Sequence, residues 1–145
     1  MFLAFSQANA QGIIYVDVNA TGSNDGSSWT DAYVSLQDAL NNSGAGDTLW
    51  VAQGTYLPTT TTERTVYFEI PDGVAVYGGF SGLETQLSER DYENNQTILS
   101  GDIGVVNDST DNSYHVVYFY NVSSTTRLDG FIVTGGHTGF FMPQG

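Results

Sequence analysis

GDTLWVAQGTY, residues 46–56, is a short apolar strand that runs into glycine, and the same pattern recurs further along the chain. The later copies are GVAVYGGF (73–80), QTILSGD (96–102) and RLDGFIVTGG (127–136). If Gly54, Gly78 and Gly101 are equivalent, the steps between them are almost equal, and the apolar stretch YHVVYFY (114–120) lengthens the next step. A strand and a turn that recur every 20 to 50 residues, roughly, are typical of solenoid proteins.

The small size of each unit restricts the fold. One strand of about five residues and a loop cannot bury an apolar face alone, so the units must stack on a shared core. The pattern contains no long amphipathic helices between the strands, which excludes the doubly wound and barrel α/β folds. The sequence therefore predicts an all-β chain wound as a parallel coil. A β-sandwich is the competing interpretation, because it also has short strands between turn signals.

One short amphipathic helix is predicted over residues 29–42. Four apolar side chains fall on one face of this segment at helical spacing, namely Trp29, Tyr33, Leu36 and Leu40. Ser28 or Thr30 would cap its start, and Gly44 would end it. We expect the apolar face to cover the open first coil as a lid, with Trp29 as the largest plug.

The composition of the chain restricts the classes of partner that it can bind. Sixteen acidic residues against three arginines and no lysine give the 145-residue chain a net charge of −13. This charge repels phosphate backbones and anionic lipids, so we expect neither nucleic-acid binding nor membrane insertion. It also repels polyuronates unless cations form bridges. The absence of cysteine excludes disulfides and thiol catalysis. The aromatic residues, 13% of the chain, are interpreted as packed ladders, with an exposed platform for sugars as the alternative.

The two ends of the chain suggest its place in a longer protein. Ala8-Asn9-Ala10 has the form of a signal-peptidase site after a short apolar run, so residues 1–10 are predicted to be the remnant of a secretion signal. Residues 11–145 are then the N-terminal cap and first coils of a solenoid truncated at its C-terminus, because no polar capping segment follows Gly136. An open last coil would expose strand edges, and we expect self-association through them.

Several further motifs carry a family resemblance when taken in order. They are YVD (15–17), GSNDGSSW (22–29), SLQDAL (35–40), VAVYGGFSGLET (74–85), ERDYENNQTILSGDI (89–103) and NSYHVVYF (112–119). Together with the glycine-ended strands they resemble the N-terminal region of large bacterial secreted proteins with right-handed parallel β-helix repeats, in the pectin-lyase-like superfamily. The resemblance implies a helix-capped, right-handed parallel β-helix, secreted or held at the cell surface. It also implies an adhesin-like or polysaccharide-binding scaffold as the function.

The alternative within that superfamily is the N-terminal part of a polysaccharide lyase or glycoside hydrolase. Elimination needs a neutral base beside a uronate, and this chain offers only arginines, which stay protonated. Arg90 lies between Glu89 and Asp91 and is predicted to form an ion pair. Hydrolysis needs paired carboxyl groups, which Asp102 would supply with Asp91 and Asp129 if the coils brought them together. We expect no catalytic and no cofactor-binding residues in this chain.

Calcium is the most plausible ligand. Hard cations prefer several oxygen ligands at close spacing. One loop supplies Asp102, Asn107, Asp108 and Asp111, with Asn112 beside them. The spacing is not that of an EF-hand, and a solvated turn remains the alternative interpretation.

Overall fold

The computed structural model describes residues 12–139 and has the architecture of a parallel β-helix. Its strands are β1 (Ile13–Val16), β2 (Thr48–Ala52), β3 (Gly54–Tyr56), β4 (Phe68–Glu69), β5 (Ala75–Phe80), β6 (Thr97–Ser100), β7 (Val117–Tyr118), β8 (Arg127–Asp129) and β9 (Phe131–Thr134). Two short helices, α1 (Leu36–Asn41) and the 3-10 helix η1 (Leu87–Glu89), interrupt them. The predicted all-β class is confirmed. The predicted signal remnant, residues 1–10, lies outside the described residues.

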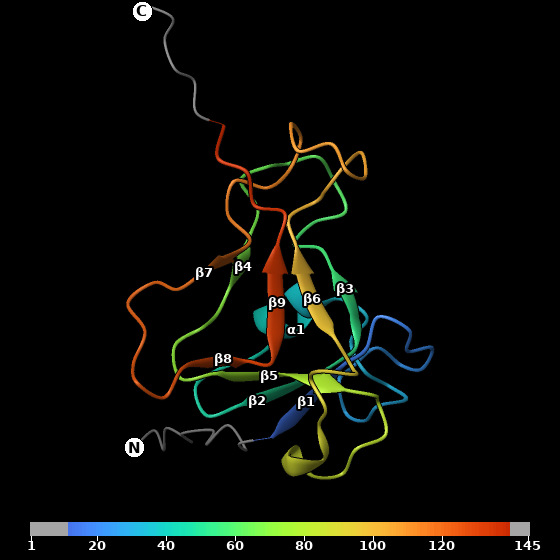
Figure 1. Ribbon diagram of the computed structural model, residues 1–145. Helices are drawn as coiled ribbons and strands as arrows, with labels where there is room; N and C mark the ends of the chain where they lie inside the picture. Colours follow the sequence, from blue (N-terminus) through green and yellow to red (C-terminus); the bar gives the residue numbers. More distant parts are fainter. Residues whose placement is uncertain (1–11, 140–145) are drawn as a thin grey trace, which may run out of the picture.

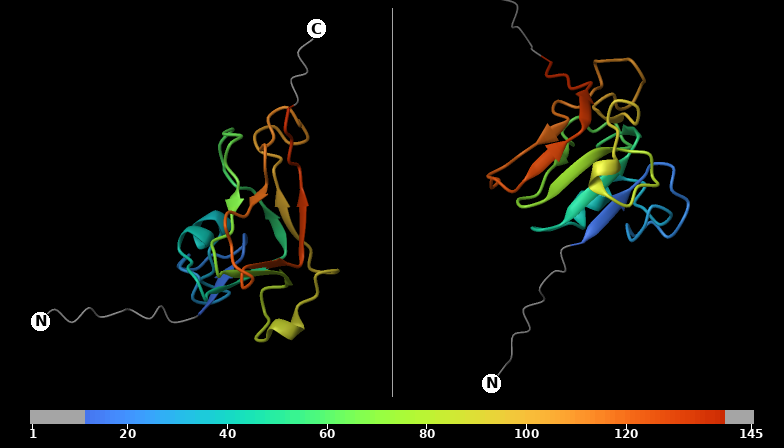
Figure 2. Two further views of the ribbon diagram at one scale, coloured as in Figure 1. Left: turned by 90° about the vertical axis from the view of Figure 1, so that its left-hand side faces the viewer. Right: turned by 60° about the horizontal axis from the view of Figure 1, so that its bottom comes forward.

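Three parallel sheets surround one core. Sheet A has the order β1-β2-β5-β8, sheet B the order β3-β6-β9, and sheet C pairs β4 with β7. Figure 1 looks along the coil from the side of β9, and the chain winds anticlockwise as it comes toward the viewer, which makes the coil right-handed. In the left view of Figure 2, α1 lies at one end of the coil and β9 at the other.

The residues that occupy equivalent positions on successive coils are not the glycines that the sequence suggested. Thr48 lies opposite Ala75, and Ala75 lies opposite Arg127, so the second of these coils is almost twice as long as the first. Gly54 begins β3 in sheet B, whereas Gly78 lies within β5 in sheet A. The predicted equivalence of the glycines and the nearly constant period were therefore wrong. The physical reason is that a coil with three sheets turns several corners, and glycine occurs at more than one of them.

The capping helix is shorter than predicted. It begins at Leu36, where the Ser35 side chain accepts a hydrogen bond from the backbone N–H of Asp38 at 3.2 Å, so neither Ser28 nor Thr30 is the cap. The residues before it form turns and bends, and Tyr33 among them exchanges backbone hydrogen bonds with Tyr15 in β1 and with Asp17 just after that strand. The lid itself is confirmed, since the apolar face of α1 joins the core through Leu36, Ala39 and Leu40.

The core is filled by inward-facing side chains from all three sheets. Leu49, Val76, Leu99 and Phe68 are all fully buried, at 0% exposure. Each such side chain stabilises the fold by about 1.5 to 3 kcal/mol through the removal of apolar surface from water. Because side chains alternate along a strand, the residues between them point outward and form the surface of the coil. Among residues 12–139, no helix combines the length and apolar character needed to cross a membrane.

Candidate functional site

Most of the aromatic side chains on the outer face of sheet A are packed against one another. Tyr15 and Trp50 are neighbours in the parallel register, and Trp50 stacks on Phe80 with ring centroids 4.8 Å apart. Trp50 and Phe80 are almost fully buried although they lie outside the central core. The interpretation of the aromatic residues as packed ladders is confirmed for this cluster.

Trp29 belongs to this outer cluster and not to the lid. Its ring lies 4.8 Å from Tyr15 and 5.5 Å from Phe80, centroid to centroid, and its indole N–H donates to the backbone carbonyl of Glu84 at 2.9 Å. The prediction that Trp29 plugs the first coil was wrong. The reason is that the segment before α1 forms turns and a bridge to β1 instead of a helix, so the tryptophan lies on the outside of sheet A.

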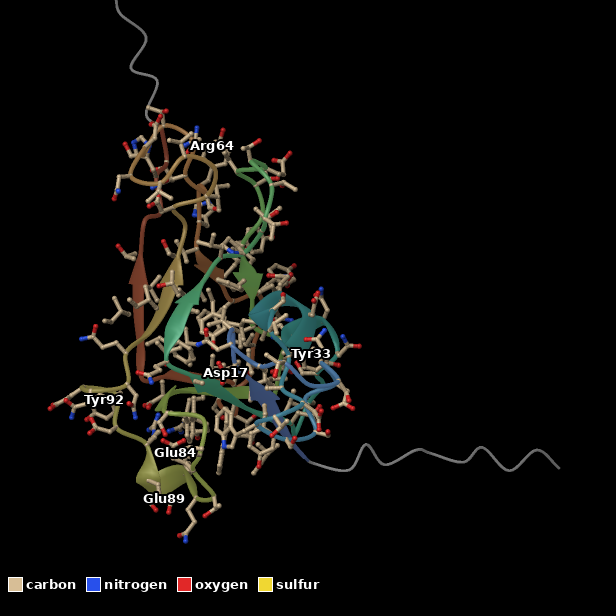
Figure 3. The ribbon with its side chains drawn as sticks, turned by 90° about the vertical axis from the view of Figure 1, so that its right-hand side faces the viewer. Asp17, Tyr33, Arg64, Glu84, Glu89 and Tyr92 are labelled. Carbon is tan, nitrogen blue, oxygen red and sulfur yellow. The ribbon has the colours of Figure 1, made fainter. Side chains whose placement is uncertain are left out.

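The loop of residues 81–96 covers the other side of this cluster, and carboxylates hold its shape. Glu84 accepts hydrogen bonds from the backbone N–H groups of Ser81 and Gly82, and Glu89 accepts from those of Thr85 and Gln86. Figure 3 shows Glu84 and Glu89 on this loop, which stands out from the body of the coil. Because the carboxylates satisfy donors within the loop, they make it a defined structure.

These hydrogen bonds also keep the acids ionised. Donation from the backbone of Thr85 and then of Gln86 lowers the pKa of the Glu89 carboxyl. Burial opposes ionisation of Glu84, but the hydrogen bonds from Ser81, from its own backbone and from Leu83 together outweigh that effect, and its pKa is lowered as well. A carboxyl group with a lowered pKa holds no proton at neutral pH, so it cannot act as a general acid.

Arg90 links this loop to the body of the coil. Its guanidinium forms an ion pair with the carboxylate of Asp129 in β8, at 2.5 Å, and lies over the rings of Tyr77 and Tyr92, at 4.9 and 6.0 Å from their centroids. The prediction of an ion pair is confirmed. Its partner is Asp129, on the next coil, and not the flanking Glu89, which caps its own loop.

An open depression of about 620 Å³ lies on this loop. It is lined by Gln86, Leu87, Ser88, Arg90 and Tyr92. Tyr92 is 56% exposed, which is unusual among the aromatic residues around sheet A. The backbone of the loop is anchored beside it, because the N–H of Asp91 donates to the carbonyl of Gly79 at 2.7 Å. The depression thus combines an exposed ring, a guanidinium and an amide on a fixed loop.

The structure divides the predicted calcium ligands. Asp102 accepts hydrogen bonds from the backbone N–H of Asn107, and both line one open hollow of about 370 Å³. Asp108 instead accepts from Thr110, whose hydroxyl lowers the pKa of its carboxyl, and Asp111 accepts from Val105. Within residues 12–139, no three His, Cys, Asp or Glu side chains gather as a metal-binding group. Calcium binding at this loop stays a prediction.

The aspartates of the hydrolase alternative do not share one cleft. Asp129 pairs with Arg90 at the corner where sheet A meets the start of β6 and β9, and Asp91 caps its own loop through Asn94. Asp102 follows the far end of β6, a strand that spans about 13 Å at 3.3 Å per residue. Paired carboxyl groups of glycosidases lie within about 10 Å of each other. This arrangement does not support a hydrolytic pair.

The depression was not predicted from the sequence. Neither Gln86 nor Tyr92 was among the residues predicted from the sequence to be functional. The available signal was the lone tyrosine within a run of polar residues, ERDYENN (89–95). A buried tyrosine usually stands in an alternating or helical apolar pattern, and Tyr92 has no apolar neighbours at those spacings.

The sheets and their register define this protein as a parallel β-helix. Comparisons with models of protein families, with curated proteins and with solved structures found no match. The parallel architecture is therefore established by the strand pairing alone.

Proposed function

We propose that this chain is part of an extracellular or cell-surface β-helix scaffold related to the pectin-lyase-like proteins, and that it binds a polysaccharide or cell-surface glycan without cleaving it. The observation that carries the proposal is the depression around Tyr92, in which an exposed ring adjoins Arg90 and Gln86. A rigid coil that presents a hydrogen-bonded loop is a common arrangement for a binding surface, since loops carry function on stable scaffolds.

The groups in the depression match the chemistry of a sugar. The exposed face of Tyr92 offers an apolar surface for the C–H face of a pyranose ring, and its hydroxyl remains available for hydrogen bonds. Gln86 and Ser88 supply further donors and acceptors for sugar hydroxyl groups. A ligand-binding site needs few polar groups if they are well placed, and here they lie on one loop.

The charge of the chain favours a neutral glycan. Arg90 is the single cationic side chain in the depression, and its charge is already paired with Asp129. The net charge of −13 adds a repulsive field for any polyanion. A neutral polysaccharide meets neither obstacle, so we expect it to bind more tightly than an acidic one of the same length.

The scaffold function also accounts for the acids of the loop. Glu84, Glu89 and Asp91 each accept backbone hydrogen bonds, and all three have lowered pKa values. Asn94, through its side chain, makes the largest contribution to the shift at Asp91. Acids used in this way fix the loop and do not supply the raised pKa that a catalytic acid needs.

Binding to a panel of neutral and acidic polysaccharides tests the proposal. We expect the wild-type chain to be retarded in affinity gels by one or more neutral polysaccharides. Tyr92→Ala should weaken that binding about fivefold, because aromatic contacts of this kind contribute about 1 kcal/mol. Tyr120→Ala is the matched control, since Tyr120 is also an exposed tyrosine, 69% exposed, but lies beyond the far sheet C.

Two outcomes would contradict the proposal. Equal binding by wild type and Tyr92→Ala would show that the depression is not the site. Release of reducing ends or of unsaturated uronates from the same panel, abolished by Asp102→Ala or Arg90→Ala, would favour the lyase or hydrolase alternative.

A further inference from the structure

We infer that the glycan-binding surface around Tyr92 continues into a second, polar groove, and that the two together bind an internal stretch of a long neutral polysaccharide. The inference rests on the proposed function and extends it from one depression to a longer binding surface. The groove has an open volume of about 570 Å³. It lies where the loop of residues 81–96 approaches the corner between β2 and β3 and the start of β6.

The two depressions meet at consecutive residues of the loop. Tyr92 lines the first, and Glu93 and Asn94 line the second. Consecutive Cα atoms lie about 3.8 Å apart, so a step of one or two residues separates the exposed ring from the groove. Figure 3 shows Tyr92 and Asp17 at a similar height of the molecule, and the N–H of Asn19, which also lines the groove, donates to the Asp17 carboxylate at 2.9 Å. A sugar chain that stacks on Tyr92 therefore reaches the groove if it extends by a few units.

Carboxamide side chains dominate the lining of the groove. Four of its eight lining residues carry this group, and all four are exposed, namely Asn19, Gln53, Asn94 and Gln96. Each carboxamide has two N–H donors and one oxygen acceptor, and a sugar hydroxyl both donates and accepts. A set of such groups thus pairs with the hydroxyls of a chain without any charge. The depression around Tyr92 supplies the stacking face, and the groove supplies the hydrogen bonds.

The stacked coils hold two of these amides side by side. Gly54 lies opposite Thr97 in the parallel register of β3 and β6, so the residues before them, Gln53 and Gln96, are neighbours about one strand spacing of 4.8 Å apart. The N–H of Gln53 donates to the carbonyl of Phe80 at 2.7 Å, and the carbonyl of Gln96 accepts from the N–H of Gly54 at 3.1 Å. A ligand that binds here orders only side chains, because the backbone is already fixed, and this lowers the entropic cost of binding.

The remaining lining favours a neutral ligand. Glu93 is the one charged side chain in the groove, and its carboxylate repels uronates. The side-chain nitrogen of Asn94 donates to the Asp91 carboxylate at 2.7 Å, which leaves the amide oxygen as an acceptor for a sugar hydroxyl. The half-buried Ile98 offers an apolar contact for the C–H groups of a sugar. The groove therefore suits the same class of ligand as the depression around Tyr92.

Titration calorimetry with neutral oligosaccharides of increasing length tests the inference. The probes are cello-, xylo- and manno-oligosaccharides, from the disaccharide to the octasaccharide. We expect the affinity of the wild-type chain to rise with length, because only the longer probes reach the groove. Gln53→Ala and Gln96→Ala should each weaken binding of the longest probe about fivefold, as expected for the loss of one net hydrogen bond, and leave the shortest unchanged. Tyr92→Ala should weaken the binding of both.

Asn41→Ala is the matched control. It removes an exposed carboxamide from α1, which lines a different depression, and we expect it to bind like the wild type. Binding that depends on Tyr92 but neither rises with length nor responds to Gln53→Ala and Gln96→Ala would overturn the groove alone and leave the depression around Tyr92 as the site. An equal loss in Asn41→Ala would overturn it as well. A wild-type chain that binds no probe of any length would overturn the proposed function, and the groove with it.

Discussion

At the scale of single residues, paired glycines decide how closely the coils stack. A Cβ on Gly101 would lie 2.6 Å from the carbonyl oxygen of Gly135, and one on Gly78 would lie 2.6 Å from that of Gly130. Each pair brings backbones of neighbouring coils together at a corner. This close approach explains why strands that run into glycine recur in the sequence, even though the glycines on different corners are not equivalent.

Gly101→Ala should therefore destabilise the chain by about 1 to 3 kcal/mol, as expected for an overpacked interior position. The obstacle is backbone on the next coil, which cannot move aside without shifting β9. Urea unfolding followed by circular dichroism measures the change. Gly139→Ala is the control, because a Cβ there would meet no atom within 4 Å. Equal midpoints for wild type and Gly101→Ala would show that the corner is looser than the distances indicate.

At the scale of elements, pairing with β1 overrides a helical pattern. Residues 29–34 have apolar side chains at helical spacing, but Tyr33 donates its N–H to the carbonyl of Tyr15, and Asp17 donates to that of Tyr33. Two tertiary backbone hydrogen bonds and the packing of Trp29 outweigh one further helical turn. Helix propensity contributes only tenths of a kcal/mol per residue, so such an override is physically reasonable.

Trp29→Ala tests the role of this segment as the cover of sheet A. We expect a loss of about 2 to 4 kcal/mol, somewhat below the usual cost for a fully buried tryptophan because the ring is half-buried. Trp29→Phe keeps an aromatic ring and loses only the hydrogen bond to Glu84, so it should cost about 1 kcal/mol. Chemical denaturation gives both values. If Trp29→Phe loses more than half of the stability that Trp29→Ala loses, the hydrogen bond to Glu84 is the main source of the stability instead.

At the scale of the whole molecule, the two ends of the described coil differ. The β1 end is covered by α1, whose apolar face belongs to the core. At the other end, Val133 faces inward like its register partner Leu99, yet it is 51% exposed. No strand within residues 12–139 pairs with the outer edge of β9. We propose self-association through this edge, between like ends, because α1 obstructs a head-to-tail stack.

Sedimentation across a hundredfold range of concentration should show a reversible dimer. The charge of −13 opposes contact, so association should strengthen as salt is added and the repulsion is screened. Val133→Lys places a charge on the open face and should give a monomer. Val106→Lys, in a loop where the side chain is 73% exposed, should not. A monomer for wild type at every concentration and salt would refute the proposal.

Several features followed from the sequence because they depend on local pattern. The short apolar runs that end in glycine, in GDTLWVAQGTY and VAVYGG, predict strands, and the lack of long helices between them favours stacked parallel coils. SLQDAL predicts a lid, since Leu36 and Leu40 can only bury their side chains on one face. These predictions succeeded because the spacing of apolar residues, and the face that they bury, depend on only a few neighbouring residues.

The tertiary structure alone decided which residues meet. Arg90 pairs with Asp129 across 39 positions of the chain, and Asn112 meets Arg64 across 48. The exposure of Tyr92 could not be predicted from the sequence either, because it depends on a loop anchored at Gly79. Successive coils differ almost twofold in length, so no regular spacing exists from which such contacts follow. The physical reason is that loops of any length close a coil at little extra entropic cost, so only the stacked strands determine which corners coincide.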